Sequence, residues 1–91
     1  MHVKNTNLKT MKVERIETDI ITFLVNNIIA PNTVVTATTI LRDIGIDSFS
    51  IVEIILFIER KYGVVIPDDQ LIPENFRTIQ ALSIIVNTLI K

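Results

Sequence analysis

Residues 47–63 read DSFSIVEIILFIERKYG, and this stretch predicts the helix around which the fold is built. Asp47 and Ser48 are both good helix N-caps, so the helix should start at one of them. Gly63 suits the position that follows a helix, because glycine adopts the left-handed conformation found there without strain. The basic pair at residues 60–61 lies in the predicted last turn, where the helix dipole favours positive charge. We therefore expect one continuous helix that ends just before Gly63.

Two further helices are predicted, one on each side of this stretch. Residues 11–29 carry apolar side chains at three- to four-residue spacing, and Pro31 disfavours any continuation of that helix. Thr78 can cap a final helix that reaches Ile90. The chain therefore has the helices that an all-helical domain needs.

The connecting segments complete the expected fold. Residues 33–43 are rich in threonine and valine but predict a long loop, because a single strand would have no partner. Residues 68–74 suggest a short helix or a pair of turns. We expect an all-α fold, a small antiparallel four-helix bundle with three main helices, one short helix and a long loop between the first two. Residues 11–91 would form the single domain, preceded by a disordered tail at residues 1–10.

The predicted central helix has two apolar faces. One stripe, at a spacing typical of core contact, comprises Ile51, Ile55, Ile58 and Tyr62. A second stripe begins directly after Ser48 and comprises Phe49, Val52 and Leu56, with Glu53 and Glu59 beside it. Ile54 and Phe57 widen the apolar surface further. The helix is therefore either buried nearly all round or offers its second stripe to a partner.

Composition excludes several kinds of chemistry. The chain has 91 residues and no cysteine, so disulfides, thiolate metal sites and a protein thiol nucleophile are excluded. Its only histidine, His2, lies in the expected tail, away from any serine that needs a base. No apolar run is long enough to cross a membrane, and the N-terminus lacks a signal-peptide pattern. We expect a monomeric cytoplasmic protein with no metal site and no membrane insertion.

Charge is distributed unevenly along the chain. Residues 43–74 carry seven acidic side chains against two basic ones, although the net charge of the chain is −1. Such a surface repels nucleic-acid phosphates and suits a basic protein surface. We therefore expect protein partners and no nucleic acid, with a merely solvated acidic surface as the alternative.

Ser48 could serve as a catalytic nucleophile, as a helix cap or as the point where a prosthetic group is attached. Catalysis needs a positioned base and an oxyanion site, and the chain has neither a second histidine nor a G-x-S-x-G elbow. A capping serine would contribute about 1 kcal/mol to stability. A phosphodiester at a helix N-terminus would be stabilised by free N–H groups and the helix dipole. The residues alone leave the cap and the attachment point open.

A family resemblance favours the attachment point. GIDSF at residues 45–49 closely resembles the Gly-x-Asp-Ser-Leu motif of acyl carrier proteins and the related peptidyl carriers. LRDI at residues 41–44 is similar to the family's approach to this motif, and YGVVIPD at residues 62–68 is similar to its helix exit. The resemblance extends over about residues 11–90.

The resemblance implies a carrier and not an enzyme. Ser48 Oγ would bear phosphopantetheine, transferred from coenzyme A by a Mg²⁺-dependent phosphopantetheinyl transferase, and acyl or aminoacyl cargo would be held on it as a thioester. Adenylate-forming ligases or acyl-transfer and synthase enzymes would be the other partners. The family's partner contacts fall here on Asp47, Phe49, Val52, Glu53, Leu56 and Glu59. Ile66 would lie near the mouth of a cavity that shelters cargo in some members.

Three departures from the family pattern bear on the cargo. Phe49 replaces the common leucine, and the basic pair at residues 60–61 stands where fatty-acid carriers are usually acidic. Residues 71–76 resemble the equivalent region of stand-alone carriers that work with adenylate-forming ligases. These features favour an accessory carrier for amino acids or unusual acyl groups, as in secondary metabolism, over one for fatty acid biosynthesis. The alternative from another class is a small helical interaction module in which Ser48 is only a cap.

Overall fold

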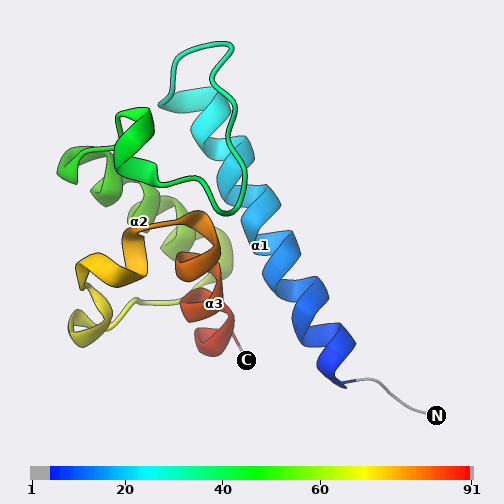
Figure 1. The fold of residues 1–91 in the computed structure, drawn as a ribbon. Coiled ribbons are helices and arrows are strands. Elements are labelled where there is room, and N and C mark those ends of the chain that lie inside the picture. The colour runs from blue at the N-terminus through cyan, green and yellow to red at the C-terminus, as the bar shows by residue number, and fades with distance from the viewer. Residues whose placement is uncertain (1–4, 91) are drawn as a thin grey trace.

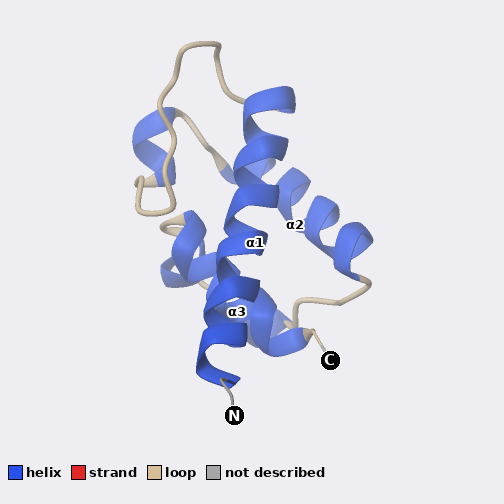
Figure 2. Cartoon of the chain, turned by 90° about the vertical axis from the view of Figure 1, so that its right-hand side faces the viewer, coloured by secondary structure: helices blue, strands red, loops and turns tan. Residues whose placement is uncertain are grey.

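The structure describes residues 5–90, and every α- or 3₁₀-element in this part of the chain is joined to the next by a loop or turn. A computed structural model shows three α-helices and three short 3₁₀ helices over these residues, with one isolated bridge between Ile40 and Thr78 and no strand (Figures 1 and 2). In chain order the elements are α1 (Asn5–Asn27), η1 (Leu41–Ile44), α2 (Ser48–Tyr62), η2 (Asp68–Gln70), η3 (Pro73–Phe76) and α3 (Ile79–Leu89). The prediction of an all-α fold is confirmed.

The first helix begins earlier than predicted. α1 includes residues 5–10, which we expected to belong to a disordered tail, so the predicted start at residue 11 is wrong. These residues are polar and lack hydrophobic periodicity, yet no glycine or proline interrupts the chain before Pro31. Helix propensity alone therefore allows the helix to begin at Asn5. Residues 1–4 of the expected tail lie outside the described residues.

The ends of α2 and α3 follow the predicted caps. Asp47 is the N-cap of α2, and Gly63 follows the helix with φ of 66°, in the left-handed region that suits glycine. Thr78 caps α3 by accepting a hydrogen bond from Ala81 N–H at 3.0 Å. These boundaries are set by local side-chain chemistry, which explains why the sequence predicts them well.

The short helix predicted near residues 68–74 is not an α-helix. The chain there forms two separate 3₁₀ helices, η2 and η3, of three and four residues. Ile72 lies between them in an extended conformation, with φ of −116° and ψ of 152°. Pro73 explains the break, because its ring disfavours a helical conformation of the preceding residue. This segment is therefore a pair of turns, the second form that the sequence allowed.

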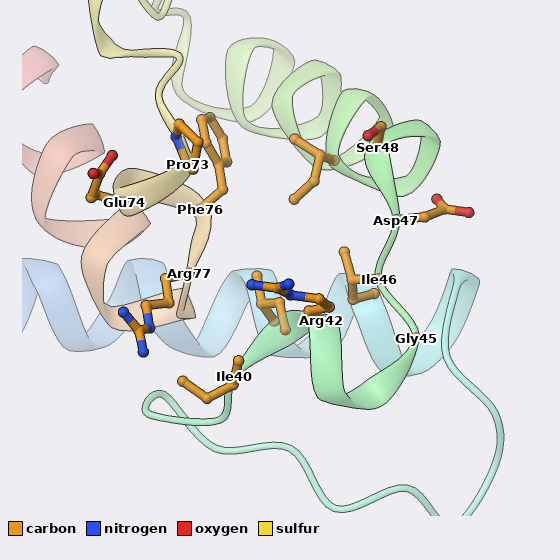
Figure 3. A pocket seen from close by; sticks show the side chains of 12 residues that line it. Ile40, Arg42, Gly45, Ile46, Asp47, Ser48, Pro73, Glu74, Phe76 and Arg77 are labelled. Atoms are coloured by element: carbon orange, nitrogen blue, oxygen red, sulfur yellow. The ribbon is translucent and has the colours of Figure 1, made fainter.

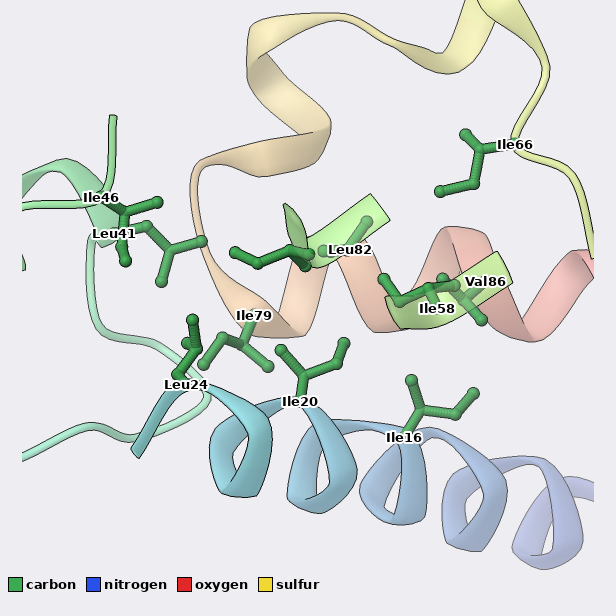
Figure 4. Packing of buried hydrophobic residues seen from close by; sticks show 11 residues of the cluster. Ile16, Ile20, Leu24, Leu41, Ile46, Ile58, Ile66, Ile79, Leu82 and Val86 are labelled. Carbon is green, nitrogen blue, oxygen red and sulfur yellow. The ribbon is translucent and has the colours of Figure 1, made fainter. Parts of the chain in front are cut away.

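All three α-helices contribute to one hydrophobic core. Its side chains, each at most 6% exposed, come from α1, from α2, from α3 and from the connections; they are Ile16, Ile20, Leu24, Ile54, Ile58, Ile79, Leu82, Val86, Leu41, Ile46 and Ile66 (Figure 4). The core-facing stripe of α2 is shifted from the predicted one, because Ile54 is fully buried whereas Ile51 and Ile55 are half-buried. A run as apolar as residues 54–58 has no polar residue to show which side faces inward.

The long connection between α1 and α2 is attached to the start of α3. Leu41 N–H donates to Arg77 O at 3.0 Å, and Gln80 N–H donates to Ala37 O at 2.8 Å. The Leu41 side chain is also 1% exposed and part of the core. These contacts hold η1 in place beside the beginning of α2. Among the described residues, no helix has the length and apolarity needed to cross a bilayer.

Candidate functional site

The beginning of α2 exposes the Ser48 hydroxyl. Asp47 Oδ1 accepts a hydrogen bond from Ser50 N–H at 2.9 Å, so Asp47 is the cap and Ser48 is the first residue inside the helix. This hydrogen bond lowers the pKa of Asp47, which keeps the cap ionised. Ser48 itself is exposed. The alternative in which Ser48 serves only as the helix cap is therefore wrong.

Gly45 places this helix start against the core. It follows η1 with φ of 90°, a left-handed conformation that reverses the chain direction. The next residue, Ile46, is 6% exposed and its N–H donates to Leu41 O at 3.1 Å. The short connection from Gly45 to Asp47 therefore fixes where Ser48 lies relative to η1.

A cleft of about 770 Å³ opens beside Ser48, between the start of α2, η1 and η3 (Figure 3). Its apolar lining comes from Ile40, Leu41, Ile46, Ile51, Pro73 and Phe76. Arg42 and Arg77 supply positive charge, and Asp47 and Glu74 supply negative charge. The cleft thus combines an apolar wall with charged groups at its edge. Ile66, expected near the mouth of a cavity, is 4% exposed and does not line this cleft.

The lining of the cleft lacks histidine, the usual base for a serine nucleophile. None of its lining residues is a histidine, a cysteine or a lysine that could act as a base for the hydroxyl. The first turn of α2 instead offers backbone N–H groups and the positive end of the helix dipole. This environment stabilises a negatively charged group bonded to the serine oxygen, and it offers no corresponding help to nucleophilic attack by the serine on a substrate.

The second apolar stripe of α2 lies on the surface. Phe49 is 73% exposed, Val52 is 52% exposed and Leu56 is 44% exposed. A helix buried nearly all round is therefore excluded, and the stripe is an apolar surface with Glu53 exposed beside it.

Glu59 differs from the other predicted contact residues. It is half-buried, and its Oε2 accepts a hydrogen bond from Ile66 N–H at 3.1 Å. The carboxylate thus ties the end of α2 to the segment that follows Gly63. The sequence predicted Glu59, like Glu53, as a residue that meets partner enzymes, and it did not reveal the hydrogen bond with Ile66 N–H.

A second groove, which the sequence analysis missed, lies between α1 and α2. It measures about 610 Å³ and is lined by Phe23, Asn27, Glu53, Leu56, Phe57, Arg60 and Lys61. Phe23 and Phe57, which both line it, stack with their ring centroids 4.4 Å apart. The basic pair at residues 60–61 therefore borders a groove that is continuous with the exposed stripe at Leu56. Only the spatial pairing of two helices creates it, so no single stretch of sequence signals it.

Comparison with known proteins identifies the family of this chain. A family model described as "Phosphopantetheine attachment site" matches residues 21–86, from the middle of α1 to α3. The chain belongs to this family. The predicted family is therefore confirmed, and so is phosphopantetheine as the covalently attached prosthetic group that the family implies. The description of this family concerns the attachment of a prosthetic group and names no catalytic activity.

Two curated proteins are similar to part of this chain. Aminoacyl carrier protein 2 of Bradyrhizobium diazoefficiens is 38% identical over 42 residues, which is 46% of this chain and 47% of that protein. The acyl carrier protein of Campylobacter hominis is also 38% identical over 42 residues, covering 46% of this chain and 53% of that protein. The aligned part thus spans about half the length of these relatives.

The residues at the start of α2 fit a phosphopantetheine group. Ser48 presents an exposed hydroxyl that capping does not occupy, because Asp47 fulfils that role. The adjoining cleft is large enough to hold an extended arm, and its apolar lining suits the uncharged part of that arm. The arginines of the cleft can bind a phosphate. The donors of the first helical turn add to this preference for an anion.

Proposed function

We propose that this protein is a carrier whose Ser48 Oγ bears the phosphopantetheine group. The observation that supports it most directly is the exposed hydroxyl at the first residue of α2, free of capping and open to the cleft. When attached, the group supplies a terminal thiol on a long arm, which can hold cargo as a thioester in a chain that has no cysteine. The protein's own residues provide the attachment point, the neighbouring cleft and a surface for partner enzymes.

We further propose that partner enzymes dock on the exposed stripe of α2. Phe49, Val52 and Leu56 would supply apolar contacts, while Asp47, Glu53 and Glu59 would face basic side chains of the partner. The stripe begins at the residue after Ser48, so a partner bound there lies next to the attachment point. Docking raises the effective concentration of a tethered cargo at the partner's active site. The phosphopantetheinyl transferase would be the first such partner, in the cytoplasm.

The cargo we propose is an aminoacyl or unusual acyl group supplied by an adenylate-forming ligase. The two relatives, one named an aminoacyl carrier protein and the other an acyl carrier protein, are equally identical to this chain over 42 residues and do not decide between the two classes of cargo. We favour aminoacyl or unusual acyl cargo over ordinary fatty-acyl cargo, because Arg60 and Lys61 border the groove beside the docking stripe. A partner adapted to a uniformly acidic helix would meet repulsion there.

Mass spectrometry tests the proposed attachment. The purified apo protein is incubated with coenzyme A and a broad-specificity phosphopantetheinyl transferase, and the intact mass is measured. We expect a gain of one phosphopantetheine in the wild-type protein and in Ser50→Ala, and no gain in Ser48→Ala. Ser50 is a matched control because it lies two residues further along the same helix. An unmodified wild-type protein, or equal gains in both alanine variants, would refute the proposal.

A further inference from the structure

Arg42 is held in a fixed place beside the attachment point. It belongs to η1, whose first residue is fixed by burial of the Leu41 side chain and by the hydrogen bond from Leu41 N–H to Arg77 O at 3.0 Å. The turn closes where Gly45 N–H donates to Arg42 O at 3.2 Å. The backbone around Arg42 is thus tied to Arg77, which precedes α3, and to Gly45 in the chain that leads into Ser48.

The Arg42 side chain is exposed and supplies positive charge at the edge of the cleft. Figure 3 shows it extending from η1 into the opening bordered by Ile46 and Phe76. The acidic side chains of the cleft do not face it. Asp47 is engaged with Ser50 N–H, and Figure 3 shows the carboxylates of Asp47 and Glu74 directed away from Arg42. A guanidinium among apolar side chains, without a facing carboxylate, is available for an acceptor that enters the cleft.

We propose that Arg42 holds the phosphopantetheine arm in this cleft by donating hydrogen bonds to its acceptor oxygens. The inference rests on the proposed attachment at Ser48, which brings a phosphodiester and amide carbonyls to the edge of the cleft. A guanidinium has five N–H donors in a planar fork and binds such oxygens at fixed orientation. The apolar lining formed by Ile40, Ile46 and Phe76 excludes water from part of the arm and strengthens those bonds. Arg42 is therefore a positioning residue for the arm.

Nuclear magnetic resonance of the modified full-length protein tests this role. The arm is introduced from isotope-labelled coenzyme A, and intact mass first verifies that it is attached. We expect the Arg42 Nε–Hε resonance to shift between the apo and the modified protein. We also expect Arg42→Gln to lower the ratio of docked to free arm about two- to five-fold, the range for a partly exposed charged contact. Relaxation of the arm's amide groups measures that ratio.

Matched variants separate a specific contact from a general change in charge. Arg60→Gln removes the same charge from the other groove and should leave arm relaxation at the wild-type value. Arg42→Lys keeps the charge without the planar fork and should restore only part of the docking. A ³¹P resonance that depends on salt in the wild type but not in Arg42→Gln identifies the phosphodiester as the contact. A shift confined to the arm's carbonyl ¹³C resonances identifies its amides instead.

The outcomes distinguish this inference from the proposed function. A protein that gains no mass at Ser48 overturns both. A protein that is modified normally, but whose arm is equally mobile in the wild type, Arg42→Gln and Arg60→Gln, overturns the role of Arg42 alone. An equal loss of docking in Arg42→Gln and Arg60→Gln would also overturn it, because net charge would then be the cause.

Discussion

Single side chains at the start of α2 have separate tasks. Asp47 accepts the capping hydrogen bond from Ser50 N–H, and this leaves the neighbouring Ser48 hydroxyl exposed. Arg42 adds positive charge to the cleft that Ser48 also lines. A capping carboxylate beside a free hydroxyl explains how the helix start can be stable while its first residue remains accessible to a modifying enzyme.

Tyr62 provides a test at the residue scale, because its hydroxyl donates a hydrogen bond to Asp19 Oδ2 and joins α2 to α1. Burial first, and then the contact with Asp19, raise the pKa of Tyr62 above its usual value near 10. The folded state therefore keeps the proton at a pH where the unfolded chain loses it, so the stabilising contribution is present below about pH 10 and lost above it. We expect Tyr62→Phe to lower the free energy of unfolding by about 1 kcal/mol at neutral pH.

Urea unfolding at neutral pH and above about pH 10 measures this effect. Tyr62 is the only tyrosine, so the difference between the wild type and Tyr62→Phe isolates its ionisation from that of the lysines. The variant should lose less stability than the wild type on going to high pH. Parallel decreases in the two proteins would contradict the role given to the Tyr62 hydroxyl.

Ser83 is a polar residue in an apolar environment. Its side chain is 0% exposed, and within the described residues its Oγ has no hydrogen-bond partner. A buried hydroxyl without a partner costs free energy, and alanine is the better helix former. We expect Ser83→Ala to raise the free energy of unfolding by about 1 kcal/mol, measured by urea unfolding. A decrease would mean that the hydroxyl has a stabilising partner in solution.

At the scale of the element, α2 has two apolar faces with different tasks. Ile54 and Ile58 are fully buried, whereas Phe49 and Val52 are more than half exposed. The caps at Asp47 and Gly63 fix the length of the helix, and packing of Ile54 and Ile58 fixes its rotation. The exposed stripe is a consequence of that rotation and lies in line with Ser48.

A pair of truncations tests this division. Ile58→Ala should lower the free energy of unfolding by about 2–5 kcal/mol, because it leaves a cavity in the core. Phe49→Ala removes a larger side chain, yet should change stability by less than about 0.5 kcal/mol because Phe49 is 73% exposed. Urea unfolding of both variants gives the comparison. Equal losses in the two variants would show that the faces are assigned wrongly.

At the scale of the whole molecule, the hydrophobic core and the proposed docking stripe use different residues. The core joins α1, α2 and α3, while the exposed side chains of the proposed docking stripe lie outside it. Substitutions on the stripe should therefore change association with partners without unfolding the carrier.

Glu53→Lys examines this separation. Glu53 is exposed on α2, so the variant should keep nearly the wild-type free energy of unfolding. Its reaction with the phosphopantetheinyl transferase should show a raised KM at low salt, and the difference from wild type should shrink at high salt because exposed charges are screened. A KM equal to that of the wild type at low salt would argue against docking on this face.

Much of the fold could be predicted from local sequence, but the sites formed between elements could not. Asp47, Gly63 and Thr78 act on their own backbone, so the ends of α2 and α3 are visible in the sequence. The break at Pro73 was ambiguous, since proline suits both a helix start and a turn. The groove at Phe23 and Phe57 joins residues that are distant in the chain, and only tertiary packing brings them together.

The same reasoning applies to the candidate site. The exposed serine and the apolar stripe follow from the motif and the helical period. The cleft and the direction of Arg42 depend on how η1 and η3 pack beside α2, and no local pattern encodes that arrangement.

The capping role of Asp47 and the backbone contact of Glu59 affect how charge scanning of this surface must be interpreted. An alanine at Asp47 would remove both a negative charge and the acceptor for Ser50 N–H, and an alanine at Glu59 would do the same for Ile66 N–H. A weaker association with an enzyme could then result either from the lost charge or from a disrupted backbone at the end of the helix, and the measurement would not separate the two causes. Asp47→Asn and Glu59→Gln retain an acceptor oxygen and remove only the charge. These amides are the substitutions from which a docking energy can be extracted.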